Sequence, residues 1–166
     1  MASDHQIRSD IIALLPRLRR FACSLTGQVA DADDIVQIAI ERALGRLDQF
    51  QAGTRLDAWL FSIVRNAWID EARSRTRRSR TFVAAEAGED VGDDGDRAMH
   101  ARLEAQQVWT AVLQLPDEQR VVISLICVEG LAYREAAEIL GVPIGTVTSR
   151  LARGREALQA LLGDVA

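Results

Sequence analysis

The stretch that decides the fold occupies residues 133–151 and reads YREAAEILGVPIGTVTSRL. Its apolar spacing predicts one helix over residues 133–140 and a second over residues 146–162, with Gly141 opening the short turn between them. Small Ala137 allows the two helices to cross closely. The apolar side chains that would fix the crossing are Ile139, Leu140, Val147 and Leu151. The pattern predicts a helix-turn-helix, and the alternative is an ordinary helical hairpin with a solvated polar face.

The second helix of this motif carries a face rich in hydroxyls and arginines. Short hydroxyl donors and forked guanidinium groups can reach phosphates and base edges in the major groove of duplex DNA. The candidate duplex-binding residues are Thr146, Thr148, Ser149, Arg150, Arg153 and Arg155.

Helical periodicity also fills the amino-terminal half of the chain. Apolar residues at three-and-four spacing predict helices over residues 7–25 and 35–47. A third helix, around residues 59–68, has a wide apolar face that completes a small core. We therefore expect a compact helical domain over residues 1–80.

An acidic segment separates the two halves. Residues 81–102 carry six carboxylates against two arginines and show no sustained periodicity until about Met99. The simplest interpretation is a solvated tether, and the alternative is a tail that mimics DNA or binds a partner. We expect an all-α protein of two small helical domains, residues 1–80 and 103–166, joined by this flexible acidic linker.

The charge of the chain is unevenly distributed. Its net value of −4 argues, taken alone, against nucleic acid as a partner. Residues 1–80, however, carry +3, with thirteen arginines against ten carboxylates. All 20 basic residues are arginine, whose forked donors suit phosphates and base edges.

Composition also excludes several classes of protein. No apolar stretch approaches the length that crosses a bilayer, and the amino terminus lacks a signal pattern, so we expect a cytoplasmic protein with no membrane span. His5 and His100 have no ligand partners at metal-binding spacing, so neither a metal nor a cofactor is predicted. A nucleic-acid enzyme would need clustered carboxylates near the basic region. Only Asp70 and Glu71 form a close pair there, so no enzymatic activity is predicted.

A basic stripe closes the first domain. It consists of Arg65, Arg73, Arg75, Arg77, Arg78 and Arg80, and it can neutralise phosphates. Side chains able to stack on unpaired bases, or to hydrogen-bond to them, are interleaved with it: Trp59, Phe61, Asn66 and Trp68. The alternative for Trp59 and Trp68 is that both are core residues.

Three stretches carry a resemblance to a known family. They are DADDIVQ at 31–37 with ERAL at 41–44, AWLFSIVRN at 58–66, and the closing segment 115–162. The first resembles the polymerase-clamp-binding helix of the extracytoplasmic-function sigma factors, the second resembles their promoter-melting segment, and the third their fourth domain. The resemblance implies a sigma factor that binds core RNA polymerase, through the clamp and flap of its large subunits, and directs promoter-specific transcription initiation.

The resemblance also implies a division of labour over promoter DNA. The first domain would read and open the minus-ten element, and the helix-turn-helix would read the minus-thirty-five element as duplex. The loop at 50–55, together with Asn66, matches the family's pocket for an extruded base. The implied minus-ten residues are Phe50, Gly53, Arg55, Trp59, Arg65, Asn66, Arg73 and Arg77.

By the same resemblance, Asp34, Gln37 and Glu41 would contact the basic clamp helices of the polymerase. Their three-and-four spacing places them on one helical face, whose alternative is a merely solvated polar surface. The chain departs from the family pattern at Ile38, where a carboxylate is lost, and at Ala132, which cannot cap the next helix. We therefore expect a weaker or shifted clamp contact and a slightly frayed helix start.

Two further stretches indicate a branch of the family. LPRLRRF at 15–21 and FQAGT at 50–54 resemble the alphaproteobacterial general-stress branch, the EcfG-like factors. That branch is held inactive by a small helical anti-sigma protein, and a phosphorylated sigma-mimicking response regulator releases it. The resemblance thus implies a stress regulon and an anti-sigma partner.

A stand-alone helix-turn-helix regulator is the second function considered. It accounts for residues 116–162 but leaves the Asn66 segment and the acidic helix unexplained. Such a regulator would bind its operator without RNA polymerase, whereas the chain's net negative charge predicts poor DNA binding by the protein alone.

Overall fold

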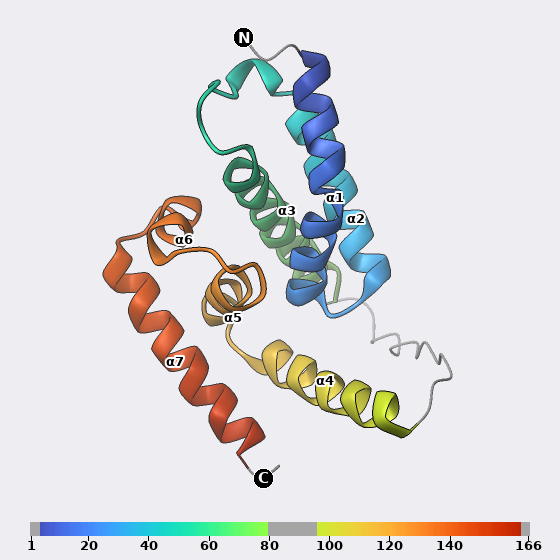
Figure 1. Ribbon diagram of the computed structural model, residues 1–166, viewed down its shortest axis with the longest axis vertical. Helices are drawn as coiled ribbons and strands as arrows, with labels where there is room; N and C mark the ends of the chain where they lie inside the picture. Colours follow the sequence, from blue (N-terminus) through green and yellow to red (C-terminus); the bar gives the residue numbers. More distant parts are fainter. Residues whose placement is uncertain (1–3, 80–95, 164–166) are drawn as a thin grey trace.

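The computed structural model describes residues 4–79 and 96–163, and these are almost entirely helical. In chain order the elements are α1 (Asp4–Thr26), α2 (Val29–Leu44), η1 (Leu47–Gln49), α3 (Leu56–Ser79), α4 (Asp96–Gln114), α5 (Asp117–Ile123), η2 (Ser124–Val128), α6 (Tyr133–Leu140) and α7 (Ile144–Leu162). The element η1 is a 3₁₀ turn and η2 is a π-helical turn. Figure 1 shows α1, α2 and α3 in one half of the molecule and α4 to α7 in the other. The all-α prediction is confirmed. None of the described helices is long and apolar enough to cross a membrane.

Helices α1, α2 and α3 pack as the predicted three-helix bundle. Its fully buried side chains include Leu18, Phe21, Leu25, Ile35, Leu60, Phe61 and Val64. The rings of Phe21 and Phe61 meet edge to face with 5.1 Å between centroids, the arrangement that aromatic quadrupoles favour. This core fixes α3, and with it the loop that precedes α3, against the other two helices.

Helix α2 begins at Val29, earlier than the predicted start at residue 35. Ala32 is buried together with Ile35, so apolar packing carries the helix back through the acidic run. Asp31 then lies in the first turn, where the helix dipole favours a negative charge. The helix ends at Leu44, short of the predicted residue 47.

Helix α4 also begins earlier than predicted, at Asp96. Ala98 and Ala101 are strong helix formers, which favours continuation of the helix through this segment. Residues 96–102 are therefore helical rather than part of a flexible linker. The rest of the predicted linker, up to residue 95, lies outside the described residues.

The helix-turn-helix forms as predicted, between α6 and α7. Gly141 ends α6 with φ +64°, a left-handed conformation that glycine adopts without strain. The start of α6 is held despite the alanine at position 132, because the Ala132 N–H donates a 2.8 Å hydrogen bond to the Glu135 carboxylate. Ala132 supplies no side-chain cap, as expected, and Glu135 provides the one side-chain hydrogen bond described at this helix start.

The two halves of the molecule share one continuous core. Helix α1 packs against η2, α4 and α5, and α3 packs against α6. Buried side chains of both halves, Phe61 and Leu125 among them, belong to a single cluster. The helix-turn-helix thus rests directly on the first domain.

Helix α7 meets α5 at Gly154, where an added Cβ would lie 3.0 Å from Ile123 Cγ1. We expect Gly154→Val to lower the free energy of unfolding by about 1–3 kcal/mol, because the added atoms overpack this contact. Urea unfolding followed by circular dichroism measures the change. Gly145→Val is the matched control, since an added Cβ there meets nothing within 4 Å. Equal losses from both changes would contradict the close approach at Gly154.

Candidate nucleic-acid interface

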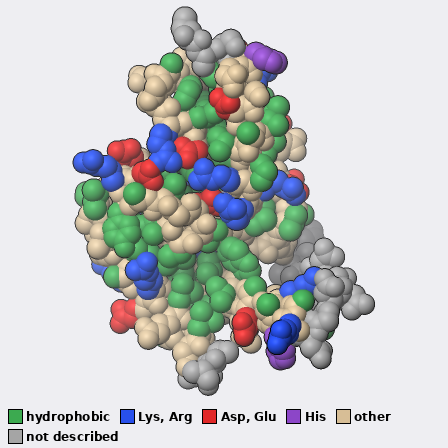
Figure 2. Space-filling model, in the orientation of Figure 1, with side chains coloured by type: hydrophobic (Ala, Val, Ile, Leu, Met, Phe, Trp, Pro, Cys, Tyr) green, Lys and Arg blue, Asp and Glu red, His purple; other side chains and the backbone are tan. Residues whose placement is uncertain are grey.

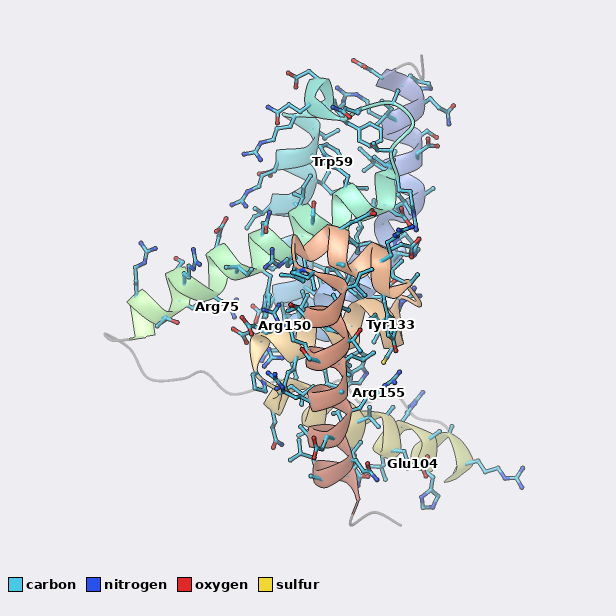
Figure 3. The ribbon with its side chains drawn as sticks, turned by 90° about the vertical axis from the view of Figure 1, so that its left-hand side faces the viewer. Trp59, Arg75, Glu104, Tyr133, Arg150 and Arg155 are labelled. Carbon is cyan, nitrogen blue, oxygen red and sulfur yellow. The ribbon has the colours of Figure 1, made fainter. Side chains whose placement is uncertain are left out.

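Helix α7 is oriented by its buried face. Val147, Leu151 and Gly154 are buried, and the missing side chain of Gly154 lets α7 approach α5. The candidate duplex-binding residues lie on the remaining faces: Thr148, Arg153 and Arg155 are exposed, and Thr146, Ser149 and Arg150 are half-buried. Figure 3 shows α7 along the face turned to the viewer, with Arg150 and Arg155 on it. The second helix of the motif is therefore presented at the surface.

Some of these side chains already have partners. Arg150 forms an ion pair with Glu118 at 3.3 Å. Thr148 Oγ1 donates to a main-chain carbonyl of α7 at 3.1 Å, and so does Ser149 Oγ. These two hydroxyls are left as acceptors, since their protons are used within the helix. The guanidinium groups of Arg153 and Arg155 are exposed cationic donors of α7.

An open groove of about 540 Å³ lies beside the loop between η1 and α3. Its lining in the first domain includes Phe50, Gly53, Thr54, Arg55, Trp59 and Ser62. The rings of Phe50 and Trp59 lie 5.2 Å apart between centroids. Gly53 has φ +97°, and an added Cβ there would meet nothing within 4 Å. Glycine is therefore favoured at this position by the positive φ of the loop and not by a close contact. We call this site the minus-ten groove, after the candidate minus-ten residues that line it.

The two tryptophans of α3 have different environments. Trp68 is 7% exposed and belongs to the core, whereas Trp59 is half-buried and lines the minus-ten groove. Nine residues separate them, which places them about half a helical turn out of phase. Trp68 is therefore a core residue, whereas Trp59 packs against the edge of the core and also lines the groove.

The structure does not bring all the candidate minus-ten residues to this groove. Phe50, Gly53, Arg55 and Trp59 line it, and the other four lie along α3. Asn66 is exposed, and its side-chain oxygen accepts a hydrogen bond from Arg65 Nη1 at 3.3 Å. Arg73 and Arg77 are exposed nearer the end of the helix. We refer to Arg65, Asn66, Arg73 and Arg77 as the α3 set.

Part of the basic stripe has a structural role. Arg75 donates two hydrogen bonds to Asp31 of α2, at 2.7 and 2.9 Å, and these lower the pKa of Asp31. Figure 3 labels Arg75 near the carboxyl end of α3. The side chains of Arg78 and Arg80 lie outside the described residues.

Arg55, at the edge of the minus-ten groove, is bound by carboxylates. It donates to Asp57 at 2.6 and 3.1 Å and forms an ion pair with Glu135 of α6. The hydrogen bond to Asp57 raises the pKa of Arg55. Burial opposes ionisation of Asp57, but hydrogen bonds from Arg55 and from the Ala58 N–H outweigh it and lower the pKa of Asp57. Both groups are charged at neutral pH.

The candidate polymerase-binding residues are exposed together on α2. Gln37 Nε2 donates to Glu41 Oε1 at 3.4 Å, and Asp34 lies on the same face. Two neighbouring carboxylates are tied down instead, Asp31 by Arg75 and Asp33 by a 2.7 Å hydrogen bond from Arg19. Asp34, Gln37 and Glu41 therefore present an accessible acidic surface.

Sequence reasoning missed one charged residue of structural importance, Glu129 in the loop after η2. Its side chain has 0% exposure and pairs with Arg17 and Arg20 of α1. The sole signal in the sequence is a carboxylate set between apolar Val128 and Leu131. Figure 2 shows basic and acidic side chains gathered in a band across the middle of the molecule, where the two halves of Figure 1 meet.

Comparisons with known proteins agree with this arrangement. A family model for Sigma-70 region 2 matches residues 11–78, and one for Sigma-70, region 4 matches residues 105–158. The ECF RNA polymerase sigma factor EcfG of Rhodopseudomonas palustris is 40% identical, over 94% of this chain and 84% of its own length.

Two solved structures are also similar. The sigma factor RpoE of Bartonella quintana, in complex with the anti-sigma factor NepR, matches with a TM-score of 0.78 and 34% identity, over 94% of this chain and 96% of that chain. CnrH, in complex with the cytosolic domain of CnrY, matches with a TM-score of 0.72 and 27% identity, over 99% of this chain and 92% of that chain. The region 2 match covers the part of the chain that a stand-alone regulator leaves unexplained. The chain belongs to the extracytoplasmic-function (ECF) sigma factors, which bind core RNA polymerase and direct it to promoters.

Proposed function

We propose that this sigma factor reads its promoter with two different surfaces, one in each domain. Helix α7 reads the minus-thirty-five duplex through its arginines and hydroxyls. The minus-ten groove and the α3 set take up the melted minus-ten strand. One observation carries the proposal: a helix face with exposed cations fits a major groove, whereas an open groove with two aromatic rings fits unstacked bases.

The domains divide the work accordingly. Residues 1–80 form the part that binds the polymerase clamp and opens the minus-ten element, and residues 103–166 form the part that reads the minus-thirty-five element and meets the flap. Asp34, Gln37 and Glu41 contact the basic clamp helices. Their exposure on α2, beside carboxylates already held by arginines, supports this assignment.

The two surfaces depend on core polymerase to act together. The net charge of −4 disfavours DNA binding by the chain alone. Core polymerase holds both domains at the spacing of the promoter elements, so that each raises the effective concentration of the other. The factor acts by binding, without catalysis of its own, in the cytoplasm where polymerase and chromosome lie.

An anti-sigma protein controls the factor in this proposal. The similar RpoE chain is in complex with the anti-sigma factor NepR, and the similar CnrH chain is in complex with the cytosolic domain of CnrY. The 40% identity with EcfG favours the general-stress branch among the ECF factors. We infer a small helical anti-sigma partner that a sigma-mimicking response regulator withdraws, and a stress regulon as the output.

The sigma assignment predicts the outcome of in-vitro transcription on fragmented genomic DNA. Core RNA polymerase supplemented with this protein is expected to start at discrete sites that share two spaced upstream motifs, and core polymerase alone is the control. Mapping of the 5′ ends gives the motifs. Operator footprints by the protein alone, without any polymerase-dependent start, would contradict the proposal.

The two surfaces predict separable defects in two variants. Arg150→Ala is expected to weaken holoenzyme binding to the upstream duplex by about 1–3 kcal/mol, the range for one good base contact. Asn66→Ala is expected to leave that step intact and to reduce opening, measured by permanganate reactivity of the minus-ten thymines. Arg8→Ala removes an exposed arginine of α1 and is the control for both. Equal effects of the two variants on both steps would count against the assignment.

The branch assignment predicts selectivity between two known anti-sigma proteins. NepR of Bartonella quintana is expected to bind this chain in isothermal titration calorimetry and to suppress its transcription in vitro. The cytosolic domain of CnrY, the matched control, is expected to do neither. Suppression by CnrY and not by NepR would place the chain in another branch.

A further inference from the structure

Glu129 joins the two domains through a buried ion pair. Its carboxylate has 0% exposure and accepts hydrogen bonds from Arg20 Nε and Nη2, both at 2.9 Å, and from Arg17 Nε at 3.4 Å. The arginines belong to α1, and Glu129 belongs to the second domain. A bidentate pair of this kind is strong and specific in geometry. We call these three residues the latch.

Two further contacts support the same packing. Arg120 of α5 donates to the carbonyl oxygen of Leu25, at the end of α1, at 3.0 Å, and its guanidinium lies 5.8 Å from the ring centroid of Trp68. Arg55 of the first domain pairs with Glu135 of α6. Charged groups therefore meet at three places between the domains, in addition to the apolar core that the domains share.

This packing places α6 along one side of the minus-ten groove. Glu138 and Ile139 of α6 form part of its lining. Glu135 forms an ion pair with the guanidinium of Arg55. That guanidinium is the group that would meet a phosphate of the melted strand. The carboxylates of the second domain thus lie at the place where the phosphates of the melted strand would bind, and they would repel those phosphates.

The same packing is incompatible with reading both promoter elements at once. The minus-ten and minus-thirty-five elements lie about 25 base pairs apart, or roughly 85 Å along B-DNA. A compact chain of this length has a radius of gyration of only about 15 Å. The domains must therefore separate before the factor spans its promoter.

We propose that the packed arrangement is an autoinhibited resting state of this sigma factor, held by the latch, and that binding to core polymerase opens it. The part of this proposal in which the packed arrangement blocks DNA binding rests on the promoter-reading function proposed above. The part in which the latch holds the two domains together rests on the contacts between them alone.

The test compares the full-length chain with Glu129→Gln, which keeps the side-chain shape and removes the charge. Small-angle X-ray scattering of the free protein is expected to show a larger radius of gyration for the variant. Fluorescence titration with core polymerase is expected to show an apparent Kd about tenfold lower, because a closed fraction reduces the affinity of the wild type in proportion.

A second variant guards against damage to the second domain. Arg20→Gln breaks the same latch from α1 and leaves the loop of Glu129 unchanged. It is expected to expand the chain and tighten core binding, to a smaller extent than Glu129→Gln does, because the ion pair between Arg17 and Glu129 remains. The double variant is expected to match Glu129→Gln, which already removes both ion pairs. Circular dichroism verifies that each variant keeps its helix content.

Glu104→Gln is the matched control. It makes the same change of charge in the second domain, at an exposed position of α4 that Figure 3 shows far from Trp59 and the minus-ten groove. It is expected to alter neither measurement. An unchanged radius and an unchanged Kd in both latch variants, or a wild type whose domains are already separate, would overturn the proposal. Neither measurement contains promoter DNA, so this failure is distinct from a failure of promoter reading, which the Asn66 and Arg150 variants report.

Discussion

A carboxylate without exposed surface needs charged donors, and Glu129 finds them in the other domain. Burial of an unpaired carboxylate is strongly unfavourable, so the loop that carries Glu129 can rest on α1 only where Arg17 and Arg20 reach it. This requirement restricts the register in which the second domain packs on the first. The contact of α6 with α3, and the meeting of Glu135 with Arg55, are consistent with that register.

The helices themselves were predictable from the sequence, because each packs an apolar face at helical spacing. Their ends were less so. Buried Ala32 extends α2 back to Val29, and helix-forming residues extend α4 back to Asp96, in both cases through acidic stretches that resemble loops in composition. A negative charge at the amino end of a helix is favourable there, so acidity alone does not mark the boundary between a helix and a loop.

The parts of the candidate site that lie within short stretches of the sequence were predictable. The turn at Gly141 and the loop around Gly53 lie within short segments, and both glycines have the positive φ that such turns favour. The opposite placement of Trp59 and Trp68 also follows from their spacing. The latch was not predictable, because Arg20 and Glu129 are 109 residues apart. A contact between residues so far apart leaves no periodic pattern in a single sequence. Tertiary packing alone shows that domains predicted as tethered are in contact.

The π-helical turn η2 has a consequence for how this contact can change over evolution. It ends directly before Glu129, whose N–H donates to the carbonyl oxygen of Ser124, five positions earlier, at 3.0 Å. Each helical residue adds about 100° of rotation, so the loss or gain of one residue in this turn would swing Glu129 away from α1. The balance between closed and open forms is thus encoded in the number of residues as well as in their chemistry. A single-codon insertion or deletion can reset it while every charged side chain between the two domains is retained.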